Sequence, residues 1–174
     1  MCHSFPETQD RKGVRVAISN GNGSRVLVIG VGNESRGDDA VGLAVSKRLK
    51  ERLPTDVVVA QETGDGARLM ELWKGFDLVV LVDAVKSGDK PGTIHMFEAH
   101  KFPLPMGLFP EEYSTHAFGI PHAIELARAM NQLPRRLLVY GIVGECFDEG
   151  SPISPAVGRA AQQLAELLTS QVLG

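Results

Sequence analysis

Two adjacent carboxylates, Asp38 and Asp39, follow an apolar run and a glycine-containing turn early in the chain. A third, Asp83, directly follows another apolar run, and His116 directly precedes a helical pattern. Imidazole suits nickel, zinc or iron as a ligand, and carboxylate suits harder ions. These residue types can therefore bind a divalent metal ion if the fold brings them together.

The segment from residue 25 to residue 53 predicts a buried strand, a glycine turn and a helix. Apolar residues of the helix recur at every fourth position and so share one face: Val41, Val45, Leu49 and Leu53. We expect Asp38 to be the N-cap, because its carboxylate can accept from the free N–H groups of the first turn. Asp39 is not needed for capping, and it suits either the helix dipole or a functional site.

Later segments predict four more strands and three more helices. The strands are expected at residues 57–60, 78–82, 93–98 and 137–143, and the helices at residues 67–74, after His116 up to Met130, and after Ser154. We expect Ser154 to cap the last helix, with Pro155 at its first position. Residues 99–115, with three prolines, predict a long loop.

The connection between the third and fourth strands decides the topology. It is too short for a parallel crossover, so the fourth strand is expected to run antiparallel to the third. The chain is therefore predicted to be an α/β protein with a mostly parallel, twisted five-stranded sheet, one strand of it antiparallel, and helices on both faces. Residues 25–174 are expected to form this single domain, and residues 1–24 a peripheral or flexible extension with a short edge strand at residues 14–18.

This topology predicts where the candidate residues meet. Carboxyl ends of parallel strands share one edge of a sheet, so Asp39 and Asp83 are expected at that edge. The helix before the fifth strand must start there too, which adds His116. Glu62 and Glu145, after the second and fifth strands, belong to the same rim and are candidate proton-transfer groups. Two carboxylates and one imidazole form a suitable divalent-metal site with open coordination positions, although each residue also has an ordinary turn or capping role.

Other chemistry has weaker support. The spacing of Gly30, Gly32 and Gly37 is not the G-x-G-x-x-G of dinucleotide binding, and no Walker lysine is present. Cys146 with His116 as base could be a nucleophile, but no local feature lowers the thiol pKa, so a loop or core cysteine is expected. The remaining histidines are read as a strand residue, a helix-surface residue and two without pattern: His95, His122, His3 and His100.

Composition restricts the class of protein. A net charge of −3 over 174 residues offers no basic surface for nucleic acid or an anionic membrane. No apolar run approaches the ~20 residues that a membrane span needs, and no signal peptide is recognisable. Two cysteines, Cys2 and Cys146, make a disulfide framework improbable and fit a reducing cytoplasm.

The candidate residues lie in blocks that resemble the hydrogenase maturation endopeptidases. The blocks occur in the family's order over about residues 25–170: residues 28–33 with 37–42, 81–85 with 91–93, 114–119, and 140–142 with 153–155. The family's metal-binding acids correspond to Asp39 and Asp83, and its histidine corresponds to His116. Asp39 stands where some members have glutamate, and Ala40 stands where glycine is common.

The resemblance implies a cytoplasmic, aspartic-type endopeptidase that trims the C-terminal extension of a hydrogenase large-subunit precursor. It implies that nickel, supplied by that subunit, is the signal for cleavage and is bound by the catalytic residues Asp39, Asp83 and His116. We expect a monomer that binds neither nucleic acid nor membrane. Two alternatives stay open: a non-catalytic nickel-sensing chaperone on the same fold, and a small-molecule-binding α/β enzyme.

Overall fold

The computed structural model describes residues 23–105, 107–110 and 118–173 of the chain. Its strands form one sheet in the order β2-β1-β3-β5-β4. The strands are β1 (Val26–Val31), β2 (Val57–Glu62), β3 (Leu78–Val85), β4 (Ile94–Glu98) and β5 (Arg136–Val143). The helices are the 3₁₀ helix η1 (Gly37–Ala40), α1 (Val41–Arg52), α2 (Gly66–Leu72), α3 (Ile120–Ala129) and α4 (Pro155–Leu173).

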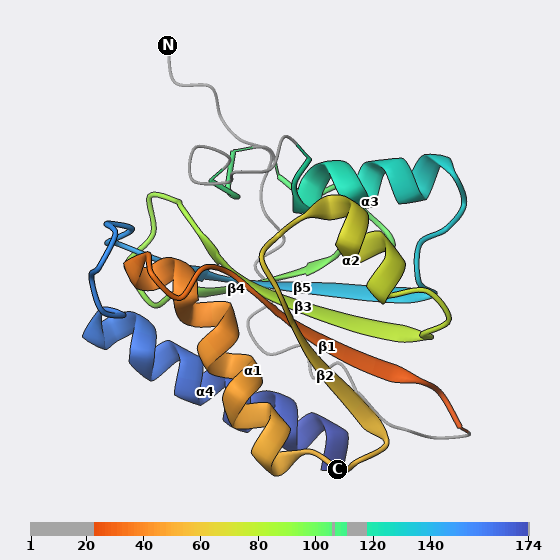
Figure 1. Ribbon diagram of the computed structural model, residues 1–174, viewed down its shortest axis with the longest axis horizontal. Helices are drawn as coiled ribbons and strands as arrows, with labels where there is room; N and C mark the ends of the chain where they lie inside the picture. The colour runs from red at the N-terminus through yellow and green to blue at the C-terminus, as the bar shows by residue number, and fades with distance from the viewer. Residues whose placement is uncertain (1–22, 106, 111–117, 174) are drawn as a thin grey trace.

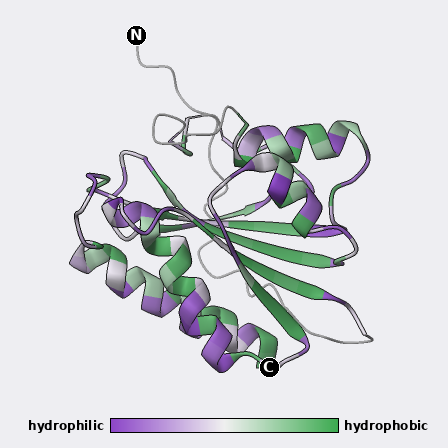
Figure 2. Cartoon of the chain, viewed as in Figure 1, coloured by the Kyte–Doolittle hydropathy of each residue, from purple (hydrophilic) through white to green (hydrophobic). Residues whose placement is uncertain are grey.

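Helices cover both faces of the sheet, as predicted. Helices α1 and α4 lie on one face, and α2 and α3 lie on the other (Figure 1). The central strands β1 and β3 are almost entirely apolar because both of their faces are covered. Figure 2 shows hydrophobic residues along the strands and on the helix faces that meet them. The predicted core residues of α4 are all buried: Val157, Ala161, Leu164 and Leu168.

The predicted antiparallel strand is confirmed. Strands β1, β2, β3 and β5 pair in parallel, and β4 pairs with β5 in the opposite direction. Since β5 is parallel to β3, β4 runs antiparallel to β3. The short connection between β3 and β4 thus leads to the outer side of β5, and β4 forms one edge of the sheet.

Several element boundaries differ from the prediction. Strand β2 continues to Glu62, and α2 ends at Leu72. The difference that matters is in β3, which continues through Asp83 to Val85 because β5 pairs with it along its whole length. Asp83 is therefore a residue within the strand, in register with Gly141, and not the first residue after it.

Glycines bring the first turn of α1 directly onto the sheet. A Cβ atom at Gly42 would lie 2.2 Å from the carbonyl oxygens of Val31 and Val82. A Cβ atom at Gly30 would lie 2.2 Å from the carbonyl oxygen of Gly42. Because real Cβ atoms do not come so close to oxygen, only glycine permits this approach. It holds η1, which immediately precedes α1, over the carboxyl ends of β1 and β3.

The described part of the predicted loop at residues 99–115 contains neither helix nor strand. It packs on the sheet through two buried side chains, Leu104 and Phe109, and Leu108 accepts a backbone hydrogen bond from Lys86. Several predictions fall outside the described residues: the extension with Cys2, His3 and the strand at residues 14–18, and also His116. No helix within the described residues is long and apolar enough to cross a membrane.

Replacing Gly42 with Ala should destabilise the protein, because the added methyl group must displace the backbone of two strands. We expect the free energy of unfolding to fall by about 1–3 kcal/mol. Gly158 in α4 is the matched control, since the nearest atom to an added Cβ is 3.9 Å away. There alanine should be neutral or stabilising by up to about 1 kcal/mol. Equal stabilities of G42A and G158A in urea unfolding would contradict the close approach.

Candidate active site

Asp83 lies near the carboxyl end of β3, among residues that are otherwise buried. Side chains alternate along a strand, so Asp83 shares the face of Leu81 and Val85, which pack toward α2 and α3. Its Oδ1 accepts a hydrogen bond of 2.8 Å from the N–H of Ala84. The residue is partly accessible to solvent. It is the only acidic residue in a strand of eight, at the edge where the prediction expected a site.

Asp39 reaches the same edge from η1. Its N–H donates to the carbonyl oxygen of Arg36 at 3.1 Å, and its carboxylate accepts from the N–H of Asn33. The turn closes tightly at Gly32, which adopts φ +152° and where a Cβ atom would lie 1.9 Å from the carbonyl oxygen of Asp39. The glycine turn after β1 therefore serves to hold Asp39.

The carboxylates of Asp39 and Asp83 interact electrostatically. Burial raises the pKa of Asp83 well above its ordinary value, and the negative charge of Asp39 raises it further, against the opposing hydrogen bond from Ala84. Burial also raises the pKa of Asp39, against the opposing effects of the Asn33 N–H and the Arg36 charge. A buried carboxyl group whose ionisation is opposed by a neighbouring carboxylate forms, together with it, a site that a proton or a cation would stabilise.

The third predicted residue, His116, lies outside the described residues. The structure describes the chain again from Phe118, two positions later in the sequence. The carbonyl oxygen of Phe118 accepts from the N–H of Gly66 at 2.8 Å, and its ring would contact a Cβ atom at Gly66 at 2.3 Å. Gly66 begins α2 just after β2, so this contact is at the carboxyl edge of the sheet. Among the described residues alone, no three His, Cys, Asp or Glu side chains form a potential metal cluster.

The prediction that Asp38 caps α1 is wrong. Ala40 occupies the N-cap position and no side chain caps the helix. The extra turn of η1 directs the buried Asp38 carboxylate away from α1, toward the loop of residues 144–154. It accepts hydrogen bonds from the N–H groups of Glu145, Cys146 and Ser154 and from the Ser154 hydroxyl.

These hydrogen bonds decide the charge state of Asp38. Burial acts to raise its pKa, but the bonds from Ser154, Cys146 and Glu145 outweigh burial, so the pKa lies below its ordinary value. Adjacent aspartates in the sequence thus have opposite pKa shifts. The sequence pattern did not predict this role, because the partners of Asp38 lie more than a hundred residues away.

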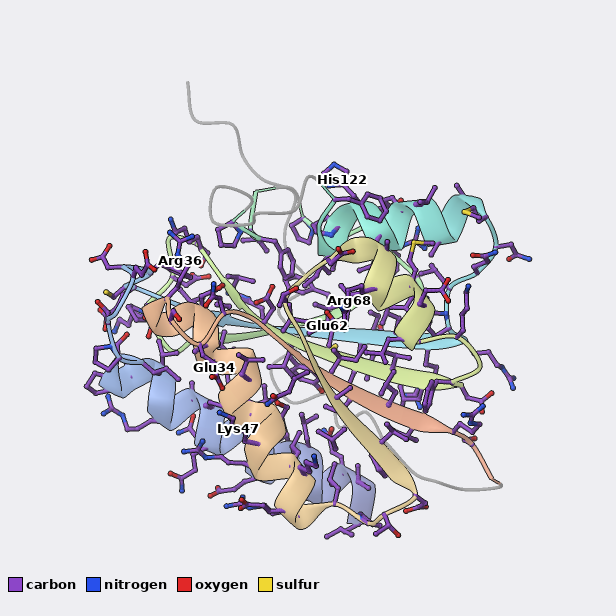
Figure 3. The ribbon with its side chains drawn as sticks, viewed as in Figure 1. Glu34, Arg36, Lys47, Glu62, Arg68 and His122 are labelled. Atoms are coloured by element: carbon purple, nitrogen blue, oxygen red, sulfur yellow. The ribbon has the colours of Figure 1, made fainter. Side chains whose placement is uncertain are left out.

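The two rim glutamates differ from each other. The side chain of Glu62 is only 8% exposed and accepts from Arg68 Nε at 2.8 Å and from the Thr63 N–H at 3.1 Å. Figure 3 shows Glu62 and Arg68 together, on the side of the sheet where α2 begins. Glu145 is exposed and contributes its backbone N–H to Asp38. Whether either glutamate transfers protons stays a prediction.

Other candidate residues have ordinary surroundings. Cys146 is a partly exposed free thiol, 3.8 Å from a carboxylate oxygen of Asp148. His95 on β4 lies 2.9 Å from Asp89, and His100 interacts with the backbone of Leu137. His122 is exposed on α3, as expected for a helix-surface residue (Figure 3).

Replacing Asp83 with Asn should stabilise the protein at neutral pH. Because the folded-state pKa of Asp83 lies above its unfolded value, the folded state holds the proton longer, and stability falls as pH rises from the unfolded to the folded pKa. Asparagine does not titrate, and its oxygen can keep the hydrogen bond from Ala84. In the presence of a chelator, the Tm of D83N should exceed that of the unmodified protein at neutral pH.

The difference in Tm should shrink as the pH is lowered toward 3.8, the ordinary value for this carboxyl. Below that pH, both the folded and the unfolded state of the unmodified protein bind the proton. A Tm of D83N below that of the unmodified protein at neutral pH would mean that the charged Asp83 stabilises the fold, contrary to the raised pKa.

Known proteins resemble this chain in sequence and in fold. The sequence model of the hydrogenase maturation protease family matches residues 43–171. The hydrogenase 2 maturation protease of Escherichia coli K12 is 27% identical over 136 residues, which is 76% of this chain and 81% of that protein. The matched residues 43–171 include the strands β2 to β5 and most of the helix α4.

Solved structures agree. The [NiFe] hydrogenase maturation protease HycI from Thermococcus kodakarensis superposes with a TM-score of 0.66 at 28% identity, over 89% of this chain and 96% of that one. The hydrogenase maturating endopeptidase HybD from E. coli superposes with a TM-score of 0.70 at 25% identity, over 83% and 89%. With its sheet, its helical layers and most of its length accounted for by these relatives, the chain belongs to the hydrogenase maturation protease family and is a peptidase.

Proposed function

We propose that this protein removes the C-terminal extension of a hydrogenase large-subunit precursor, and that it recognises nickel in that subunit through Asp39, Asp83 and His116. The observation that carries the proposal is the convergence of Asp39 and Asp83 at one edge of the sheet. The two residues come from different elements, and their carboxyl groups both have raised pKa values. The names of the relatives supply the substrate class.

The chemistry of the two carboxylates suits a cation that arrives with the substrate. Close negative charges in a buried setting repel each other, and a divalent ion between them removes that repulsion. Two oxygen ligands are too few and too hard to hold nickel strongly, so the subunit that carries the ion must supply the remaining ligands. An incomplete site of this kind would distinguish a nickel-loaded precursor from an empty one.

His116 completes the proposed ligand set. The hydrogen bond from Gly66 to Phe118 supports this assignment, because it ties the segment two residues after His116 to the carboxyl edge of the sheet. An imidazole nitrogen is a better nickel ligand than a third carboxylate oxygen would be. It would also bring the ligand set to two acids and one histidine, with positions left open for the substrate.

The bound ion would polarise the carbonyl group of the scissile peptide or activate water, in addition to marking the substrate. The chain's own contribution is to orient the carboxylates and to keep water from screening them. Arg36 favours the charged form of Asp39. We favour recognition as the main role of the ion, with some catalytic help.

A non-catalytic nickel-sensing chaperone would have the same fold and bind the same precursor without a change in its mass. The other alternative is a small-molecule-binding enzyme. A surface hollow lined by Trp73, Phe76, Leu133 and Arg135, among others, lies between the loop after α2 and the loop before β5. Those loops are at the opposite edge of the sheet from Asp39 and Asp83.

Removing any one proposed ligand should abolish processing of nickel-loaded precursor. We expect the variants D39N, D83N and H116A to fold, because D39N and D83N keep the size of the side chain and H116A removes one polar ring. The measurement is the mass of the precursor after incubation with purified protein. We expect loss of the C-terminal extension with the unmodified protein and no change in mass with the three variants. The control H122A, which lacks an exposed histidine of α3, should process normally.

Nickel-free precursor should stay intact with every variant. Cleavage of nickel-free precursor at the normal rate would show that nickel is not the signal. Normal trimming by H116A would remove the histidine from the ligand set. A stable complex with nickel-loaded precursor, without any change in mass, would favour the chaperone.

A further inference from the structure

We infer that Asp38 is a positioning residue for this reaction: by binding the loop of residues 144–154 it fixes the place of its neighbour Asp39. The inference rests on the role proposed for Asp39. It assigns no contact with substrate to Asp38 itself. The two aspartates then have separate tasks, one facing the edge of the sheet and the other locked into the protein.

The surroundings of the Asp38 carboxylate carry this inference. One oxygen accepts from the Ser154 N–H at 2.7 Å. The other accepts from the N–H groups of Glu145 at 2.9 Å and Cys146 at 3.0 Å, and also from the Ser154 hydroxyl. All these donors come from one loop, and Asp38 is fully buried. A buried carboxylate with so many donors is held in one orientation.

Backbone contacts join the same two segments. The Asp38 N–H donates to the Cys146 carbonyl oxygen at 2.8 Å, and the Gly150 N–H donates to the Ser35 carbonyl oxygen at 2.7 Å. A Cβ atom at Gly37 would lie 2.4 Å from the Cys146 carbonyl oxygen. The turn after β1 and the loop after β5 therefore form one hydrogen-bonded unit.

Asp39 depends on this unit for its position. Its N–H and its carboxylate bond to Arg36 and Asn33, which belong to the same turn, so these two bonds cannot fix that turn relative to β3. The Asp38 carboxylate supplies the tie to a different part of the chain. Ser154 directly precedes α4, which packs against α1, so the tie extends to the helical layer under the site. Loosening it would let Asp39 move relative to Asp83.

A carboxylate suits this position better than an amide. Four donors point at its two oxygens, and an asparagine would direct N–H groups at some of them. The depressed pKa of Asp38 agrees, since the hydrogen bonds favour the charged form over the neutral one. D38N is therefore a nearly isosteric change that disrupts the hydrogen bonds between residue 38 and the loop of residues 144–154.

Kinetics on nickel-loaded precursor test the inference. D38N should lower kcat by about 100-fold, the effect of misplacing a reacting group by about 1 Å, with little change in KM. S154A removes one donor and should lower kcat roughly tenfold. S154T restores the hydroxyl and should recover most of the activity. NMR signals of Asp39 should shift in D38N and S154A but return toward their original values in S154T.

Asp65 provides the matched control. Its carboxylate also accepts two backbone N–H groups, from Ala67 and Arg68, but these two hydrogen bonds cap α2 and join residues within one turn of the chain. D65N should lower Tm while leaving kcat within about threefold of the original, as expected for loss of a cap alone. A similar loss of kcat in D65N and D38N at similar loss of Tm would make Asp38 a stabilising residue only.

The outcomes separate this inference from the proposed function. If D39N is inactive while S154A and D38N keep normal kcat, the proposed function stands and the positioning role is wrong. If D39N processes normally, the proposed function fails and the positioning role fails with it. If D38N does not fold, the comparison of S154A with S154T decides, and equal kcat values for those two variants would overturn the inference.

Discussion

The structure depends on the placement of two like charges at one edge of a buried sheet. Asp83 interrupts an otherwise apolar strand, and Asp39 lies nearby in η1, after the turn that follows β1. Burial and mutual repulsion act against ionisation of Asp83, so this arrangement opposes folding at neutral pH. Perturbed carboxylates of this kind are candidates for a functional site, and the chain belongs to a family of peptidases.

Other features of the fold hold this unfavourable pair in place. Gly30 and Gly42 let α1 lie against the ends of β1 and β3, which brings η1 over β3. The Asp38 carboxylate then binds the turn to the loop after β5. The close contacts at the glycines and the hydrogen bonds of the buried Asp38 carboxylate thus hold the segment that carries Asp39. Stability elsewhere comes from the two apolar layers on either side of the sheet.

Most of the fold could be predicted from the sequence because patterns among nearby residues determine its helices and strands. Apolar runs predict the strands, four-residue spacing predicts α1, and the short connection after β3 predicts the reversal of β4. The role of Asp38 could not be predicted in this way. The prediction that Asp38 caps a helix considers only neighbouring residues. The hydrogen-bond partners of Asp38, Cys146 and Ser154, are distant in the sequence. The length of β3 was also missed, because it is set by pairing with β5.

The convergence of Asp39 and Asp83 followed from topology alone, since parallel strands end at one edge. Their raised pKa values did not, because burial of a carboxylate depends on how closely loops and helices cover it. Gly32 illustrates the difference. Its place in the sequence indicates a turn. Only the structure reveals how tight the turn is: a Cβ atom at Gly32 would lie 1.9 Å from the carbonyl oxygen of Asp39.

Crystals of the protein soaked with a divalent ion such as nickel, and measured at the metal's absorption edge, would test the central claim most directly. The account predicts one anomalous peak at bonding distance from carboxylate oxygens of both Asp39 and Asp83, and its loss in D39N. A peak elsewhere on the protein with the two carboxylates unligated, or a peak at this edge that persists unchanged in D39N, would contradict it.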